Sequence, residues 1–464
     1  MPDASPPSSA KDIDSLVVGA GISGLAHARI RHDNGQRVHI LDTNDEPGGS
    51  VRSFRREGFL VEEGPNSMLV KSQEVWDWLG KLGLGPRIVE ANPAANRRYL
   101  VKEGRLVAMP SSPWSAVKTP LYSPAAKLRL LAEPFLPRTN LADESVTSFV
   151  SRRMGPEFLE YGISALVSGI FAGDPDRLSL THAFPKVWNL EQTYGSLIGG
   201  ALRLRRHRRK ASIKPFKSRL ISFRDGLAEL TGALAQPLLQ DGLLSLSSRL
   251  GTLRRDPDGH WHVRVLRPDG ETVLRCREVV VTIPLHQYGE IPFLRDLDLA
   301  ELTRHPYPPL STLVLGFPRT AVQHPLDGFG ALFPRREQRF SLGTLFSSTL
   351  FPLRAPQDQV SLMTFIGGVR QPDNARMETP KLVERVLADL SPLLGLRGDP
   401  SFLHHCFWPQ AIPQYNVGHG EVLAQLDHLE TRHPGLRLRG NFRGGPGLHD
   451  CLAGALSEPS HATA

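Results

Sequence analysis

Apolar and polar positions near the start of the chain follow a strand–turn–helix–strand pattern. The apolar run 15–18 predicts a first strand, the glycine-rich segment 19–24 predicts a tight turn, and the stretch to about Asn34 predicts a helix. Gly35 suits the position just after a helix, where the backbone adopts a left-handed conformation, and residues 37–41 predict a second strand. The pattern therefore predicts a βαβ-type opening.

Later parts of the chain change from helical patterns to strand patterns. Residues from about 70 to 215 show helical patterns that proline and serine clusters interrupt. From about 240 the pattern favours strands, and the chain closes on a glycine-rich segment, 440–454. The elements expected in this half are strands at 259–266, 278–283, 310–316 and 360–366, a turn at 269–270, and a helix over about 381–390.

Length and charge limit the possible classes of protein. The chain has 464 residues, more than the about 250–300 that one hydrophobic core sustains, so more than one domain is expected. A net charge of +8 fits solubility, an anionic membrane surface or an acidic substrate. No nucleic-acid module is evident, so nucleic acid is not an expected partner. The basic segment 202–217 is expected to be a solvated loop, with an anionic membrane contact as the alternative.

The cysteines and the apolar runs predict where in the cell the protein is located. Cys276, Cys406 and Cys451 form neither a CxxC pair nor a disulfide framework, which indicates a reducing compartment. Residues 1–14 match neither a signal peptide nor an arginine-rich transit peptide. The apolar runs are shorter than the ~20 residues that span a bilayer. We therefore expect a cytoplasmic protein, with peripheral contact at the inner face of the membrane left open.

Three glycines after the first strand form a nucleotide-binding fingerprint. Gly19, Gly21 and Gly24 make a G-x-G-x-x-G segment between strand and helix, and Asp42 lies 18 positions after the last of them. Gly19 makes the turn, Gly21 lets the backbone approach a pyrophosphate, and Gly24 allows close packing of helix on strand. The helix N-terminus offers N–H groups to the phosphates, and Asp42 can accept hydrogen bonds from ribose hydroxyls.

The segments that follow favour FAD over NAD. Residues 46–53 and 61–67 are similar to the double-glycine and "EEGPxS" segments shared by the amine oxidase and protoporphyrinogen oxidase flavoproteins. Gly49 can bring backbone against the phosphates and the ribitol, and residues 64–67 are expected to form a backbone cradle beside the flavin ring. Arg52 is expected either to neutralise phosphate or flavin charge or to be an ordinary surface arginine.

Four later segments resemble the oxygen-dependent protoporphyrinogen oxidase family more specifically. Residues 96–113 are similar to its arginine–tyrosine stretch and 166–180 to its "VSGVYAGDPxxLS" motif. Residues 343–368 are similar to its "GTLFSS" block, and 408–419 to its "WxxAxPQYxxGH" motif. The resemblance runs from about residue 14 to 455, nearly the whole chain. It favours this family over amine oxidases and desaturases.

The resemblance implies an α/β fold with an interrupted Rossmann-type FAD-binding domain, a mixed-sheet substrate domain and a helical, membrane-facing lobe. The FAD-binding domain is expected in three parts, 1–85, 216–290 and 401–464. The lobe is expected over 86–215 and the substrate-binding domain over 291–400. A homodimer is a further expectation.

The activity implied by the resemblance is oxidation of protoporphyrinogen IX to protoporphyrin IX in heme biosynthesis. Hydride transfer from a meso or methine carbon to the flavin, and re-oxidation by O₂ with release of H₂O₂, would repeat until six electrons are removed. No side chain is expected to be an obligatory general base, because the cofactor carries the chemistry. His32 and the pair His404–His405 lack partners at metal-ligand spacing, so no metal is expected.

The resemblance also implies roles for single residues. Arg98 is expected to pair with a substrate propionate, with Arg97 as a less favoured neighbour, because a guanidinium can bind a carboxylate through two hydrogen bonds. Leu250 is expected to meet the adenine through its backbone. The other expected substrate contacts are Gly173, Phe329, Leu345 and Phe365, and the expected cofactor contacts are Gly19, Gly21, Ile22, Ser23, Gly24, Asp42, Gly49, Arg52, Gly64, Pro65, Asn66, Ser67, Leu250, Trp408, Gly447 and Leu448.

Some positions depart from the family pattern, and alternatives stay open. His27 and Arg31 lie four apart on the first helix where small and apolar residues are usual. Pro446 removes a backbone N–H near the flavin, His449 replaces a proline, and Asp42 replaces a glutamate. The alternatives are a coproporphyrinogen III oxidase, which extra basic residues around the propionate-binding arginine would favour, a flavin amine oxidase, and a non-catalytic tetrapyrrole-binding homologue.

Overall fold

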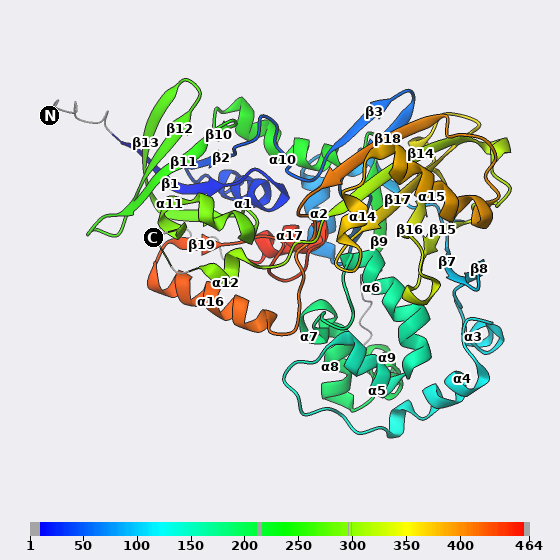
Figure 1. Cartoon of the computed structure of the whole chain (residues 1–464). Helices are drawn as coiled ribbons and strands as arrows, with labels where there is room; N and C mark the ends of the chain where they lie inside the picture. The colour runs from blue at the N-terminus through cyan, green and yellow to red at the C-terminus, as the bar shows by residue number, and fades with distance from the viewer. Residues whose placement is uncertain (1–9, 211–215, 296, 298, 459–464) are drawn as a thin grey trace.

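A computed structural model describes residues 10–210, 216–295, 297 and 299–458, which form two large sheets and a helical lobe (Figure 1). The first sheet has the strand order β10-β2-β1-β13-β12-β11. Its long strand β13 pairs with β12 near its start and in parallel with β19 at its end, so strands from three distant parts of the chain share this sheet. The bounds are β1 Lys11–Val18, β2 Val38–Leu41, β10 Leu244–Ser245, β11 Arg249–Arg255, β12 Trp261–Arg267, β13 Gly270–Val281 and β19 Leu436–Leu438.

The opening of the chain confirms the strand–turn–helix–strand prediction. Helix α1 follows β1, Gly35 has a φ of 76°, and β1 pairs with β2 in parallel. One face of the sheet buries leucines of α1, α2, α10 and α17 in a common core, and the other face is covered by α11, α12, α16 and η4. The bounds are α1 Ile22–Asp33, α2 Gln73–Lys81, α10 Ala228–Gln240, α17 Leu448–Leu456, η4 Leu285–Glu290, α11 Pro292–Arg295, α12 Ala300–Thr303 and α16 His419–Arg432.

The second sheet is mixed and has the order β18-β14-β17-β16-β15-β7-β8. Its neighbours are antiparallel except β15 and β7, which are parallel. One face packs on α15, and the other face meets the β3–β4 hairpin through Phe59, Val61, Met363 and Phe402. The bounds are β3 Ser53–Arg56, β4 Phe59–Glu62, β7 Arg97–Lys102, β8 Arg105–Ala108, β14 Leu310–Pro318, β15 Gly328–Leu332, β16 Ser341–Phe346, β17 Gln359–Gly367, α15 Thr379–Leu394 and β18 Phe402–Trp408.

Short elements connect the two sheets. Strands β5, β9 and β6 form a three-stranded sheet in that order. Short helices lie between the strands of this sheet and between those of the second sheet. The bounds are β5 Met68–Val70, β6 Ile88–Glu90, β9 Arg219–Phe223, η1 Gly85–Arg87, η5 Arg319–Ala321, η6 Arg335–Glu337, α13 Ser347–Leu350, η7 Pro352–Arg354 and α14 Pro372–Ala375.

The helical lobe gathers at one end of the molecule (Figure 1) and starts later than its expected range of 86–215. Strands β6, β7 and β8 lie inside that range, and β7 and β8 belong to the second sheet, so the helices begin only with α3. The bounds are α3 Pro113–Lys118, α4 Pro124–Leu131, η2 Glu133–Phe135, α5 Val146–Arg153, the π-helix η3 Phe158–Ile163, α6 Ser164–Phe171, α7 Leu180–Ala183, α8 Pro185–Tyr194 and α9 Leu197–Lys210.

One local prediction is wrong. The basic segment 202–217 is helical as far as the end of α9, and residues 211–215 lie outside the described residues. The carboxylate of Glu133 accepts the N–H groups of Leu197 at 2.8 Å and Ile198 at 3.1 Å, and therefore caps α9 from a distant position in the chain. The glycine-rich segment 440–454, for which no element was predicted, contains the first part of α17, which begins at Leu448.

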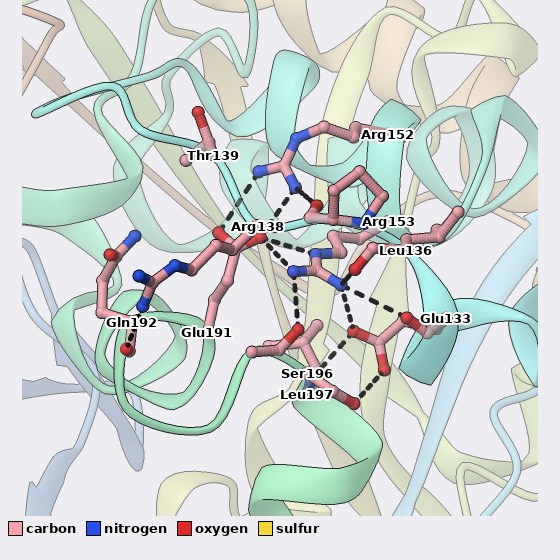
Figure 2. Close-up of polar contacts among 12 residues, drawn as sticks. Glu133, Leu136, Arg138, Thr139, Arg152, Arg153, Glu191, Gln192, Ser196 and Leu197 are labelled. Atoms are coloured by element: carbon pink, nitrogen blue, oxygen red, sulfur yellow. Dashed lines mark hydrogen bonds and ion pairs between the residues drawn. The ribbon is translucent and has the colours of Figure 1, made fainter.

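A cluster of buried charges holds the lobe together (Figure 2). Arg153, Glu133 and Glu191 are each 0% exposed. Arg153 Nε donates to Glu191 Oε1 at 2.6 Å, and its Nη1 donates to Glu133 Oε1 at 3.2 Å and to the Leu136 carbonyl oxygen at 3.0 Å. Arg152 closes the cluster from the surface by donating to Glu191 at 2.7 Å. One arginine thus joins α5, η2 and α8 and supports the cap of α9.

Within the described ranges, every helix is too short or too polar to cross a bilayer.

Candidate functional site

The turn between β1 and α1 has the geometry of a phosphate-binding turn. Gly19 has a φ of 103°, which disfavours any side chain. A Cβ on Gly24 would lie 1.8 Å from the Gly19 carbonyl oxygen, so glycine is required for this approach of α1 to β1. A Cβ on Gly21 would meet no atom within 4 Å, so the space beside it is open. Because α1 begins with neither a side-chain cap nor an acidic residue in its first turn, its first N–H groups are available to an anion.

A second glycine turn lies against the first. Gly48 and Gly49 have φ values of 119° and 61°, and a Cβ on Gly49 would lie 3.2 Å from the Cα of Gly21. Arg52 Nε donates to the Gly49 carbonyl oxygen at 3.2 Å, and its guanidinium lies 5.8 Å from the ring centroid of Trp408. The fold therefore brings the double glycine, Arg52 and Trp408 together from segments far apart in the sequence.

Asp42 fixes the nucleotide turn as well as offering a ribose ligand. Its Oδ2 accepts the Ala20 N–H at 2.5 Å, and its Oδ1 accepts the Asn44 N–H at 2.8 Å. The Asp42 carbonyl oxygen accepts the Ser248 N–H at 2.8 Å, which places Leu250, two residues further on, near the same end of the sheet. Each carboxylate oxygen has two lone pairs, so Asp42 can still accept from a hydroxyl group.

A buried ion pair supports the cradle segment 64–67. Arg354 and Glu62 lie 3.0 Å apart, with side chains 2% and 1% exposed. Arg354 Nη2 also donates to the Asn66 carbonyl oxygen at 2.7 Å. Burial raises the pKa of the Glu62 carboxyl, while the Arg354 guanidinium favours its charged form. Sequence analysis did not assign Arg354, although it lies beside the "GTLFSS" block.

Asn66 presents a buried acceptor without a protein partner. Its Nδ2 donates to Met363 Sδ at 3.1 Å, whereas its Oδ1 has no hydrogen-bond partner among the described residues. A Cβ on Gly64 would lie 2.0 Å from a backbone carbonyl oxygen of the double-glycine turn. The Glu63 carbonyl oxygen accepts Trp408 Nε1–H at 2.9 Å. A glycine-lined backbone, an indole and an unpaired acceptor fit the polar edge of a flavin ring, which carries an N–H donor.

The remaining assigned cofactor residues lie around these two turns. Ile22 and Ser23 are the first residues of α1, and Pro65 and Ser67 lie in the loop between β4 and β5. Gly447 is the N-cap of α17 and Leu448 is its first residue. The start of α17 packs on α1, because Leu448 and Leu452 share a buried core with Leu25. Two helix N-termini therefore lie at the same site.

His27 and Arg31, the two residues of α1 that depart from the family pattern, lie outside the glycine turn. Arg31 pairs with Glu278 of β13 at 2.9 Å and with Glu458 at 3.4 Å, and His27 Nδ1 lies 3.3 Å from the same Glu458 carboxylate. These contacts tie α1 to β13 and to the segment after α17. His449 Nδ1 accepts the Lys71 N–H at 3.4 Å. The unusual side chains on α1 have acidic partners and leave the glycine turn open.

Three of the assigned substrate residues, Arg98, Leu345 and Phe365, share one face of the second sheet. Arg98 and Leu345 both lie opposite Gly330, and Leu345 lies opposite Met363. Phe365 lies two residues along from Met363 on the same face, since side chains alternate along a strand. This face meets the cradle, because Asn66 contacts Met363. Phe329 lies where the register between β15 and β7 shifts, and the Arg98 guanidinium is 5.4 Å from the centroid of its ring.

Gly173 belongs to a loop that two other segments hold in place. A Cβ on Gly173 would lie 2.7 Å from Gln414 Oε1, which is buried without a partner. Gln414 Nε2 donates to the Phe171 carbonyl oxygen at 2.8 Å. The Val369 N–H donates to the Ala172 carbonyl oxygen at 2.8 Å, which ties the loop to the end of β17. Sequence analysis did not assign Gln414, but it lies in the "PQYxxGH" motif, which signals it.

Buried histidines beside this loop give a pH-dependent prediction. His419 stacks on Tyr415 at 4.3 Å between centroids and lies 5.4 Å from His305. Burial lowers the pKa of His305 to about 4 and that of His419 to about 3. Both rings are therefore neutral in the folded protein at pH values where the unfolded chain, with a histidine pKa of about 6.5, binds protons.

We expect the stability to be complete above about pH 6.5 and to fall as the pH drops towards 4. Two such groups correspond to about 4 kcal/mol between pH 6.5 and pH 5, at about 1.4 kcal/mol per group and pH unit. Urea unfolding at pH 7 and pH 5 measures this loss. His305→Gln is expected to reduce it by about 2 kcal/mol, the share of one such group, and equal stability of the wild type at both pH values would contradict the prediction.

The sequence matches a known protein family and is similar to named relatives. The family model of the flavin containing amine oxidoreductases matches residues 22–456. The mitochondrial protoporphyrinogen oxidase of Nicotiana tabacum is 34% identical over 96% of this chain and 93% of its own length. The coproporphyrinogen III oxidase of Staphylococcus aureus is 29% identical over 94% of this chain and 96% of its own length.

Solved structures give the same picture of the fold. The crystal structure of a candidate protoporphyrinogen oxidase from Exiguobacterium sp. 255-15 superposes with a TM-score of 0.79 at 25% identity, over 97% of this chain and 98% of that one. A cyclohexylamine oxidase from Brevibacterium oxydans IH-35A, 18% identical over 96% of this chain and 98% of its own, superposes with a TM-score of 0.65. The two-sheet arrangement with an interrupted nucleotide-binding domain is thus shared well beyond close sequence similarity.

Proposed function

Because the chain belongs to the family of flavin containing amine oxidoreductases, we propose that it is an FAD-dependent oxidase that converts protoporphyrinogen IX to protoporphyrin IX in heme biosynthesis, with O₂ as acceptor. The observation that carries the proposal is the face formed by Arg98, Leu345 and Phe365, which meets the flavin cradle through Asn66 and Met363. An apolar surface with a cation at its edge suits an apolar macrocycle with propionate groups. Relatives named protoporphyrinogen oxidases, at 34–35% identity, support this substrate.

The residues around the two glycine turns fit FAD. The N-terminus of α1 and Gly21 would hold the pyrophosphate, Asp42 the ribose, and the backbone at Leu250 the adenine. The cradle from Gly64 to Ser67, with the start of α17, would hold the flavin ring. FAD bound there supplies the two-electron acceptor.

The protein itself binds and orients the substrate. Arg98 holds a propionate by charge-assisted hydrogen bonds, and Phe329, Leu345 and Phe365 pack on the macrocycle and exclude water from it. Burial raises the pKa of Cys406 on the same face to about 11, so its thiol stays neutral. His404 on that face is paired with Glu63 at 3.0 Å. We therefore assign no side chain as a general base, and positioning is the contribution of the chain.

The test begins with the visible spectrum of the purified protein. Protoporphyrinogen IX added without oxygen is expected to bleach a flavin band, and porphyrin fluorescence is expected to rise when air is admitted. Coproporphyrinogen III in parallel separates the two porphyrinogen substrates. A flavin that neither compound bleaches would overturn the proposal, and a protein that cannot be loaded with FAD would point to tetrapyrrole binding without catalysis.

Arg98→Ala is expected to lower kcat/KM for protoporphyrinogen IX about 10- to 100-fold, chiefly through KM. The reason is the loss of a hydrogen bond to a charged group, worth about 1.5–3 kcal/mol. FAD content is expected to stay at the wild-type level, because Arg98 lies on the sheet face and not in the cradle. Steady-state kinetics and the ratio of flavin to protein absorbance measure both. Equal kcat/KM in variant and wild type would remove the assigned role.

The helical lobe supports a further proposal, peripheral contact with an anionic membrane. Its interior contains the buried charge cluster, whereas its surface exposes Phe135 at 87%, Leu131 at 68% and Trp114 at 68%. Exposed apolar surface of this extent beside a basic helix, α9, suits a bilayer with anionic headgroups. A cytoplasmic location at the inner face of the membrane and a homodimer stay predictions of the sequence.

Vesicles of phosphatidylcholine with phosphatidylglycerol test this contact. The protein is expected to sediment with them, and Phe135→Asp is expected to reduce the bound fraction several-fold at unchanged FAD content. Leu239→Asp is the matched control, because Leu239 is also exposed, at 46%, but lies on α10 outside the lobe. Equal binding of Phe135→Asp and wild type would exclude this surface as the membrane contact.

A further inference from the structure

The two adjacent arginines at the start of β7 have different surroundings. Side chains alternate along a strand, so Arg97 and Tyr99 project from one face of the second sheet and Arg98 from the other. Tyr99 packs with Phe346 in the core beneath α15. Arg98 shares its row with Leu345, on the face that meets the flavin cradle. Arg97 therefore points away from the substrate face.

Asp327 holds Arg97 in this position. One carboxylate oxygen of Asp327 pairs with the Arg97 guanidinium, and the other accepts the Tyr99 hydroxyl at 2.6 Å. The same carboxylate thus binds both residues that flank Arg98 on β7. Asp327 immediately precedes β15, and Gly328 lies opposite Arg97 in the register of the two strands. We call Arg97, Tyr99 and Asp327 the arginine clamp.

The arginine clamp also lies beside the residues that meet the substrate. Phe329 follows Asp327 by two positions and lies in the register shift between β15 and β7, a feature that redirects side chains. Its ring lies under the Arg98 guanidinium, 5.4 Å away. The formal charges of Arg97, Arg98 and Asp327 sum to one positive charge, and without Asp327 they would sum to two.

We propose that Asp327 is a specificity-determining residue, which neutralises the charge of Arg97 next to Arg98, so that the site favours a porphyrinogen with two carboxylates over one with four. The inference rests on the proposed function, since it concerns the substrate of the same site. The two porphyrinogens differ in this respect: protoporphyrinogen IX carries two propionates, and coproporphyrinogen III carries four. An added positive charge beside Arg98 favours the more acidic of them.

The test compares the two substrates in Asp327→Asn, which keeps the shape of the side chain and an acceptor for Tyr99. The ratio of kcat/KM for coproporphyrinogen III to that for protoporphyrinogen IX is expected to rise about three- to fivefold at low salt, the range of one exposed charge–charge contact. The rise is expected to shrink at high salt, because exposed charges are screened. A purely structural role for the clamp would not give this salt dependence.

Two further variants complete the design. Arg97→Ala in the Asp327→Asn background is expected to return the ratio to the wild-type value, because the added charge is removed. Glu271→Gln removes a negative charge from an exposed pair with Arg264 on the first sheet and is expected to leave the ratio unchanged. An unchanged ratio in Asp327→Asn, or a raised ratio that survives removal of Arg97, would overturn the inference.

A binding measurement separates this inference from the proposed function. The dissociation constants of coproporphyrin III and protoporphyrin IX, measured by porphyrin fluorescence with the FAD-loaded protein, need no turnover. Their ratio is expected to shift in Asp327→Asn as the kinetic ratio does. A wild type that oxidises neither porphyrinogen overturns the proposed function, whereas an unshifted ratio of dissociation constants overturns the role of the clamp.

Discussion

Gly24→Ala is expected to lower the affinity for FAD at least about tenfold and to destabilise the nucleotide-binding domain, since overpacking of this kind costs about 1–3 kcal/mol or more. The added Cβ would lie 1.8 Å from the Gly19 carbonyl oxygen and 2.6 Å from Thr282 Oγ1. Neither atom belongs to a flexible side-chain end that could move away cheaply. Helix α1 must therefore retreat from β1, and its N–H groups leave the position that the pyrophosphate requires.

The measurement is the flavin content after purification together with titration of the apoprotein with FAD. Gly80→Ala is the matched control, because Gly80 lies within helix α2 and a Cβ there would meet no atom within 4 Å. That variant is expected to bind FAD normally and to gain up to about 1 kcal/mol of stability from helix propensity. Stoichiometric FAD in Gly24→Ala would contradict the account of the turn.

The same turn shows how much of the site the sequence alone could predict. Gly19, Gly21 and Gly24 lie within six residues of one another. Their spacing therefore predicts the local turn without information from the rest of the chain. Asp42 was assigned to the ribose, but its second task, accepting the Ala20 N–H, depends on how β2 lies beside β1. Contacts that depend on such pairing are not visible in the local pattern.

The roles of residues whose partners are distant in the sequence are not visible in the local sequence pattern. His27 and Arg31 were noted only as departures from the family pattern. The local pattern does not reveal Glu278 and Glu458, which bind them. Arg354 went unassigned for the same reason: its partner Glu62 lies far away in the chain. In each case, the fold pairs a buried charge with a residue that no helical or strand spacing could identify.

Strand pairing explains the difference in the lobe boundary. Strands β7 and β8 precede the first helices of the lobe, so continuity along the chain suggests that they belong to it. Hydrogen bonds join β7 instead to β15, more than two hundred residues later, with Arg98 opposite Gly330, and β8 pairs with β7 at the edge of the same sheet. Arg98 is therefore carried by the second sheet, whereas the sequence-based boundary had placed it in the lobe.

Helix α9 shows most clearly how a contact with a distant residue stabilises a secondary-structure element. A run of arginines has acceptable helix propensity, but a short helix in water is marginal without further support. The support comes from Glu133, whose carboxylate accepts two N–H groups of the first turn and the Ser196 hydroxyl at 2.7 Å. Arg153 in turn neutralises Glu133. The helical state of the basic segment depends on this buried cluster.

Arg153→Met is accordingly expected to destabilise the lobe by about 3–5 kcal/mol, because it leaves Glu133 and Glu191 buried without their common partner. Figure 2 shows Arg153 lying between the two carboxylates. Without it, Glu191 keeps its pair with Arg152, whereas Glu133 has no other cationic partner among the described residues. The loss is expected in the lobe before the FAD-binding domain, since the cluster joins α5, η2, α8 and α9. Hydrogen exchange of α9 and α5 is expected to accelerate while flavin content stays near the wild-type level.

Arg152→Met is the matched control for this prediction. Arg152 is 28% exposed and binds Glu144 and Glu191 from the surface, so its loss leaves Arg153 to neutralise Glu191. Its cost is expected to be about 1–3 kcal/mol, below that of Arg153→Met, because the buried Glu144 loses its cation but keeps the Ser148 hydroxyl at 2.9 Å. Urea unfolding followed by hydrogen exchange of the lobe helices compares the two variants. Equal destabilisation by both would contradict a special effect of the buried position of Arg153.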